Sequence, residues 1–89
     1  MRISIYYPRL QKITHDQPVV NVEGRNVGEC LDLLVKKFSG VNELLFDERG
    51  VPLDYVGFYV NGVLLHPLDM NQQVHDGDEL SIVSRISGG

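Results

Sequence analysis

Two glycines at positions 88 and 89 are the residues whose type and place most directly indicate chemistry. A glycine pair there contributes nothing to packing, because it buries no side chain and orders poorly. It does suit a carboxylate that must enter the narrow active site of a partner and be activated there. We therefore expect the Gly89 carboxylate to be the reacting group and Gly88 to give it access.

Other side chains with chemical potential lack the spacing that a site needs. Cys30 is the sole cysteine, which excludes an intrachain disulfide and a four-cysteine metal or iron–sulfur site. Its place in an apolar helical pattern predicts buried packing. The three histidines, at positions 15, 66 and 75, have no ligand spacing. We expect no bound metal and no cofactor.

The composition describes an ordinary folded domain. The chain has 89 residues, of which 43% are hydrophobic and 22% charged, so we expect a single domain over residues 1–89. The net charge of −4 argues against nucleic acid as a partner. The basic pair Lys36 and Lys37 is read as a solvated face near a helix end. The sequence has no membrane-span or signal-peptide pattern, so we expect a cytoplasmic protein.

One long amphipathic helix stands out among the elements that must position this end. Asn26 can cap it and Glu29 can reach back to its first turn, while Gly40 is expected to end it. Its apolar residues recur at helical spacing and form one stripe: Val27, Cys30, Leu31, Leu34, Val35 and Phe38.

Strands are expected on both sides of that helix. Residues 1–7 alternate, with Ile3, Ile5 and Tyr7 on one face, and residues 8–18 read as a loop between prolines. The other expected elements are strands at 19–22, 56–60, 63–65 and 79–84, a helical turn at 41–46, and turns at 61–62 and 76–78. This order predicts an α+β fold, a mixed sheet of four to five strands packed on one main helix.

Three segments together resemble the ubiquitin-like β-grasp sulfur carriers of the MoaD/ThiS family. They are the capped helix at 26–40, the segment Phe-Tyr-Val-Asn-Gly at 58–62, and His-Asp-Gly-Asp-Glu-Leu at 75–80, which is similar to the family's DGDEV turn. A strand and a terminal Gly-Gly then follow, as in the family. The resemblance covers essentially the whole chain and implies a β-grasp fold with residues 84–89 as a flexible C-terminal tail.

The resemblance also implies a role. A ubiquitin-activating-type adenylyltransferase would use ATP to adenylate the Gly89 carboxylate, and a sulfur donor would convert it to a thiocarboxylate. A sulfur-accepting synthase would then take the sulfur, with this chain as a small non-catalytic subunit of a possible heterotetramer rather than an enzyme. Molybdopterin is the favoured product, with thiazole and cysteine as alternatives.

Docking should use the exposed face of the sheet together with the tail. We expect Phe58 and Val60, or their alternates Val56 and Tyr59, to contact the partner with Arg85 and Ile86. Two other functions stay open. The chain could be a ubiquitin-like modifier that joins lysines through Gly89, or a β-grasp adaptor that is never activated at its end.

Overall fold

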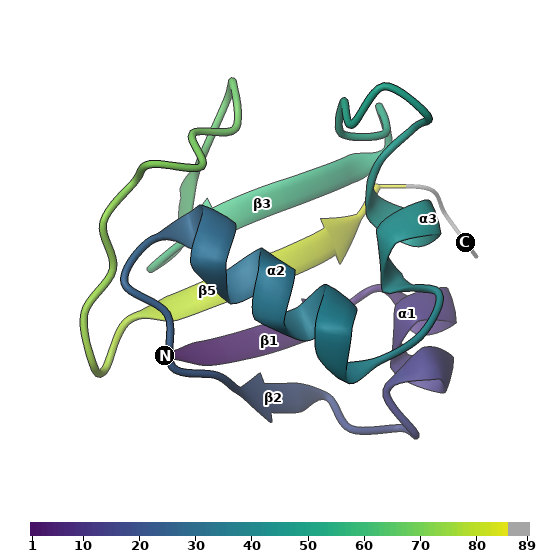
Figure 1. The fold of residues 1–89 in the computed structure, drawn as a ribbon, viewed down its shortest axis with the longest axis horizontal. Coiled ribbons are helices and arrows are strands. Elements are labelled where there is room, and N and C mark those ends of the chain that lie inside the picture. The colour runs from purple at the N-terminus through teal and green to yellow at the C-terminus, as the bar shows by residue number, and fades with distance from the viewer. Residues whose placement is uncertain (86–89) are drawn as a thin grey trace.

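The computed structural model describes residues 1–85 and shows one sheet covered by helices on one face (Figure 1). The strands are β1 (Arg2–Tyr6), β2 (Val19–Asn21), β3 (Val56–Val60), β4 (Val63–Leu64) and β5 (Glu79–Ser84); the helices are α1 (Pro8–Ile13), α2 (Val27–Lys37) and α3 (Val41–Leu45). The strand order is β2-β1-β5-β3-β4. Among the strands of residues 1–85, only the central β1–β5 pair is parallel, so the sheet is mixed, and the predicted β-grasp architecture is confirmed.

Helix α2 forms as its sequence predicts. The Asn26 side chain accepts a hydrogen bond of 2.8 Å from the Glu29 N–H, which satisfies one free donor of the first turn. The Glu29 carboxylate reaches back to the Arg25 N–H at 3.0 Å. The apolar stripe faces the sheet, and five of its six members are buried: Val27, Cys30, Leu31, Leu34 and Phe38.

The core lies between α2 and the inner face of the sheet. Ile3 and Ile5 of β1 pair in register with Leu80 and Ile82 of β5, and all four side chains are almost fully buried. Phe58 of β3 lies opposite Ile82 of β5 and stacks on Phe46, with the two ring centroids 6.1 Å apart. Burial of this apolar surface is the main force that holds the sheet to the helix.

Segment 8–18 is not the loop that its prolines and polar residues suggest. It contains helix α1, which begins directly after β1 with Pro8 in its first turn, where the missing N–H costs no hydrogen bond. Leu10 is buried, and Gln11 donates through its side chain to the Ile5 carbonyl at 2.6 Å. One buried residue and one backbone contact therefore stabilise a helix that is too short to show periodicity.

Positive backbone φ angles mark the turns. Asn61 and Gly62 have φ angles of 49° and 83°, as a tight hairpin between β3 and β4 requires, and Gly77 at 93° turns the chain into β5. Gly40 has a φ angle of 91°, but it precedes α3 rather than ending α2. Helix α2 ends at Lys37, and Phe38 after it is already extended, because its ring packs into the core.

Candidate functional site

The root of the tail is fixed to the body by a backbone hydrogen bond. The Arg85 N–H donates to the Tyr55 carbonyl oxygen at 2.7 Å, directly after β5. Ser84, which was expected to open the tail, is the last residue of β5 and pairs with Val56. Ile86, Gly88 and Gly89 lie outside the described residues. The structure therefore shows that β5 ends at Ser84 and that Arg85, which we call the tail root, is bonded to the body.

The outer face of the sheet is apolar at the end from which the tail leaves. Tyr6, Val83 and Gly57 lie side by side in adjacent strands, and Tyr59 is the next outward residue of β3. The Tyr6 side chain is 59% exposed, while Val83 and Tyr59 are half-buried. We call Tyr6, Tyr59, Val83 and Arg85 the tail-end patch. It is a partly exposed surface at the end of β5.

Gly57 creates the space for Arg85 in this patch. A Cβ placed on Gly57 would lie 3.3 Å from Arg85 Nη2 and 3.2 Å from the Tyr59 ring. The guanidinium therefore lies over the bare Gly57 backbone, beside the aromatic ring. The arrangement holds an always-charged group at the edge of an apolar surface, where it can pair with a carboxylate of a partner.

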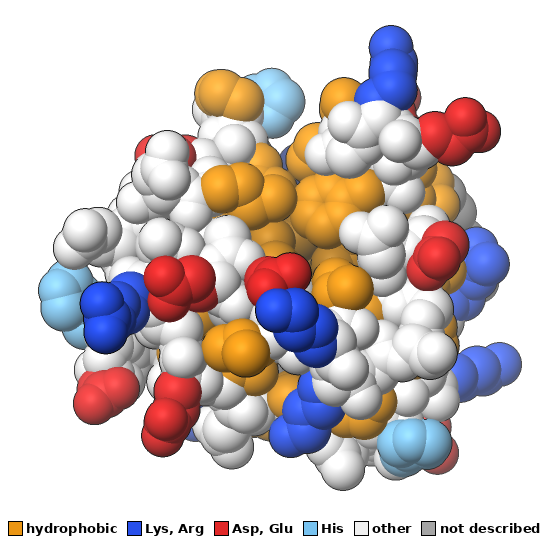
Figure 2. Space-filling view, in the orientation of Figure 1, with side chains coloured by type: hydrophobic (Ala, Val, Ile, Leu, Met, Phe, Trp, Pro, Cys, Tyr) orange, Lys and Arg blue, Asp and Glu red, His pale blue; other side chains and the backbone are white. Residues whose placement is uncertain are grey.

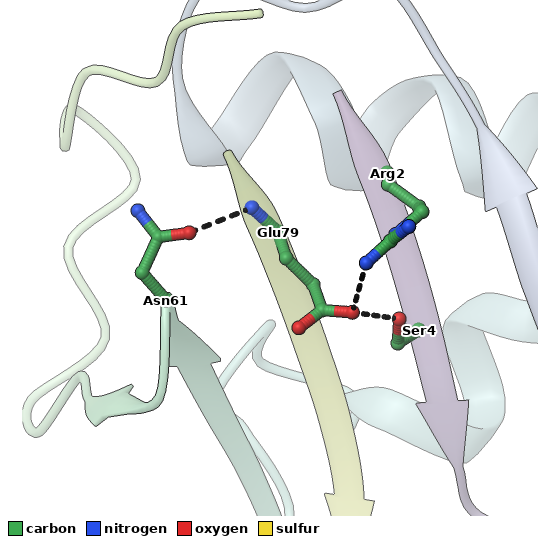
Figure 3. Close-up of polar contacts among 4 residues, drawn as sticks. All are labelled: Arg2, Ser4, Asn61 and Glu79. Carbon is green, nitrogen blue, oxygen red and sulfur yellow. Dashed lines mark hydrogen bonds and ion pairs between the residues drawn. The ribbon is translucent and has the colours of Figure 1, made fainter. Parts of the chain in front are cut away.

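A polar network occupies the opposite end of the same face (Figure 3). The Glu79 carboxylate accepts from Ser4 Oγ at 2.5 Å and from Arg2 Nη2 at 3.2 Å, while Asn61 Oδ1 accepts from the Glu79 N–H at 3.0 Å. The Ser4 hydrogen bond, and then that of Arg2, lower the pKa of Glu79. This network joins β1, β5 and the β3–β4 hairpin and has a structural role.

Two of the expected docking residues, Phe58 and Val60, lie on the inner face of the sheet instead of the exposed one. Phe58 is 2% exposed and stacked in the core, and Val60 lies on the same inner face and packs against it. The pairing of β3 with β5 decides this, because Phe58 must lie beside the buried Ile82. Of the two alternates, Tyr59 points outward, whereas Val56 is buried in the core.

An apolar hollow lies on the helix side, next to the tail root. Figure 2 shows hydrophobic side chains gathered in this depression. It has a volume of about 280 Å³ and is lined by residues of segments 51–58 and 65–68 together with Arg85. Arg85 thus lines this hollow and also belongs to the tail-end patch.

Sequence reasoning named Tyr59 and Arg85 of the tail-end patch but missed Tyr6 and Val83. Tyr6 already stood on the outward side of the alternation in β1, so that signal was present. Gly57 and Val83 carry no signal by themselves, because their place depends on the register between β3 and β5.

The other reactive side chains of the described residues do not assemble into a site. Cys30 is fully buried, and this burial raises the pKa of its thiol, which disfavours the nucleophilic thiolate. Within residues 1–85, the structure brings together no group of three or more metal-ligating side chains. In the same part of the chain, no helix has the length and apolar character to cross a membrane.

Comparison with known proteins agrees with the fold. The ThiS family model matches residues 5–89. The structure is similar to a chain of the Amycolatopsis orientalis BexX/CysO complex, with a TM-score of 0.80, 25% identity and coverage of 98% of this chain and 99% of that one. It is also similar to SAMP1 from Haloferax volcanii, with a TM-score of 0.77, 25% identity and coverage of 100% and 98%. No curated protein sequence gives a significant match.

Proposed function

Because this chain belongs to the ThiS family, whose sulfur carriers are small and non-catalytic, we propose that Gly89 is activated and charged with sulfur by partner enzymes. The main support for the proposal is the extent of the family match along the sequence. It covers residues 5–89 and so includes Gly88 and Gly89. The described fold supports it, because β5 and Arg85 direct the chain toward those glycines from one defined end of the sheet.

The proposed chemistry has two steps on the carboxylate. A carboxylate oxygen of Gly89 attacks the α-phosphorus of ATP held by a ubiquitin-activating-type enzyme, and pyrophosphate leaves. A hydrosulfide equivalent from a sulfur donor then attacks the carbonyl carbon, and AMP leaves. The product is a thiocarboxylate that can pass its sulfur to an acceptor. Glycine suits both steps, since without a Cβ the tail can pass close to enzyme backbone.

The tail-end patch is the proposed docking surface for the activating enzyme. Its members surround the tail root, so a protein seated on them has the tail at its surface. Exposed Tyr6 and half-buried Tyr59 supply the aromatic contacts that dominate protein interfaces, and Arg85 supplies a charge. We retain Ile86 as a tail contact and replace Phe58 and Val60 by Tyr6 and Val83.

Intact-mass spectrometry tests the proposal directly. The protein is incubated with ATP, a sulfide source and an adenylating enzyme from the same genome. We expect a mass increase that corresponds to replacing one oxygen by sulfur, located in the C-terminal peptide. An unchanged mass with an enzyme that charges another ThiS-family protein in parallel contradicts the proposal.

Protein modification is the second candidate, and one comparison favours it. The chain is 25% identical to SAMP1, and a structure of this Haloferax volcanii protein names it a small archaeal modifier protein. The same acyl-adenylate would then be attacked by a lysine amine, giving an isopeptide bond. Branched peptides linked through Gly89 identify this outcome, whereas a carrier gives the thiocarboxylate alone.

The third candidate is a β-grasp adaptor that is never activated at Gly89. Adding one residue after Gly89 should leave the binding function of an adaptor intact but should prevent activation of a carrier.

If the protein is a carrier, the synthase that accepts its sulfur decides whether molybdopterin, thiazole or cysteine is made. Co-purification with that synthase, including a heterotetramer in the molybdopterin case, identifies the pathway.

A further inference from the structure

Strand β2 has a free side in the described sheet. It lies at one end of the strand order and, among residues 1–85, pairs only with β1, with Val20 opposite Ile3. The Ile5 N–H donates to the Pro18 carbonyl at 2.8 Å, and the Val22 N–H donates to the Met1 carbonyl at 3.0 Å. Since alternate residues of an antiparallel strand bond to the same neighbour, the N–H and C=O groups of Val19 and Asn21 point away from β1.

An open groove runs between this edge and helix α2. Its walls are residues 21–23 on one side and Leu33, Lys36 and Lys37 on the other. Leu33 lies outside the buried stripe of α2 and is 37% exposed, the same exposed fraction as Val19. A strand added beside β2 would point every second side chain toward Leu33. The edge therefore offers backbone hydrogen bonds with an apolar contact beside them.

The charge of the groove is opposite to that of the whole chain. Lys36 and Lys37 stand on its helix side in a protein of net charge −4. Figure 2 shows basic side chains next to apolar ones on this part of the surface, below the middle of the view. Lys36 Nζ pairs with Asp32 at 3.0 Å, but both side chains are more than half exposed, so the pair holds Lys36 weakly. Glu23, on the strand side of the groove, would repel an anionic group of a ligand there.

We propose that this groove binds an extended acidic segment of a partner protein, which adds to the sheet beside β2. Its backbone bonds to Val19 and Asn21, an apolar side chain packs on Leu33, and carboxylates pair with Lys36 and Lys37. Addition of a strand to an exposed edge is a recurrent way to bind peptides. The groove is separate from the tail-end patch, so the inference does not depend on activation of Gly89.

An NMR titration of the whole ¹⁵N-labelled protein tests the proposal. The probe is a capped peptide, Glu-Glu-Val-Thr-Leu-Thr-Val, and the control peptide has two lysines in place of the glutamates. We expect saturable amide shifts centred on Val19, Asn21 and Leu33 with the acidic peptide. Lys36→Glu with Lys37→Glu should weaken binding by about threefold or more, whereas Lys12→Glu on α1 should not.

Asn21→Pro tests the backbone contact. Proline removes the outward N–H of Asn21 but no hydrogen bond to β1, so the fold should persist and binding should be lost. Spectral dispersion of the variant checks the fold. Equal binding of both peptides, full binding by Asn21→Pro, or shifts confined to another surface would overturn the proposal. Self-association of the protein through β2, seen as concentration-dependent shifts without peptide, would overturn it as well.

Discussion

At the scale of single residues, Arg85 connects the described body to the proposed reaction. Its backbone is bonded to Tyr55, and its guanidinium rests over Gly57, which adds no Cβ to displace it. These contacts fix the direction in which the chain leaves β5. Arg85 therefore lies between the sheet and the residues that follow it in the sequence.

Arg85→Ala should therefore impair docking while leaving stability nearly unchanged. The side chain is exposed, so we expect a change of within about 0.5 kcal/mol in the free energy of unfolding. The KM for the protein in the adenylation assay should rise several-fold, because a desolvated charge contact to the enzyme is lost. Arg25→Ala, at an exposed position before α2, is the matched control; an equal effect of both variants would argue against a role for Arg85.

Gly57→Ala tests the same arrangement from the other side. The new methyl group would meet the Arg85 and Tyr59 side chains at 3.2 to 3.4 Å, so both must shift slightly. We expect a folded protein that is adenylated more slowly, because the Arg85 guanidinium can no longer lie over the backbone of residue 57. Wild-type kinetics for this variant would show that the position of Arg85 does not matter.

At the scale of elements, helix α2 depends on its N-terminal cap. Asn26→Ala removes the side-chain acceptor for the Glu29 N–H and should destabilise the protein by about 1 kcal/mol. Asn26→Asp keeps an acceptor and should retain most of the stability. Urea denaturation measures both; a loss as large for aspartate as for alanine would contradict the capping role.

The Glu79 network makes the junction of β1 and β5 sensitive to pH. The folded-state pKa of Glu79 is lowered from its ordinary value of 4.5, by Ser4 first and Arg2 next. A lowered pKa means that this stabilisation is complete above the unfolded-state pKa and is lost as the pH falls through the folded-state pKa. Glu79→Gln should reduce stability at pH 7 and show a smaller further loss on acidification than the wild type. Parallel acid curves for the two proteins would contradict this.

The elements also show how far the sequence could predict the fold. Helix α2 and the Asn61–Gly62 hairpin were predictable because their signals are local: periodicity, a cap and a turn pair. Helix α1 was not, because it has six residues and one fully buried side chain. The outward face of β3 could not be predicted either, since the strand is apolar throughout and only its register with β5 selects Tyr59.

At the scale of the whole molecule, folding and function are separable. The core holds one sheet and one main helix together, and the glycines that we propose to react follow the last described strand in the sequence. The described residues hold a buried cysteine and assemble no metal-ligating cluster. In the proposed function, partner enzymes supply the chemistry. Changes at the end of the chain should then alter charging without altering thermal unfolding.

Exchange of radiolabelled pyrophosphate into ATP, catalysed by the adenylating enzyme, tests the central claim most directly. The wild-type protein should support exchange, because its Gly89 carboxylate forms the acyl-adenylate reversibly. Deletion of Gly89 should abolish exchange and leave the thermal unfolding midpoint unchanged. Exchange at the wild-type rate with the deletion variant would show that the reacting group lies elsewhere and would contradict the account.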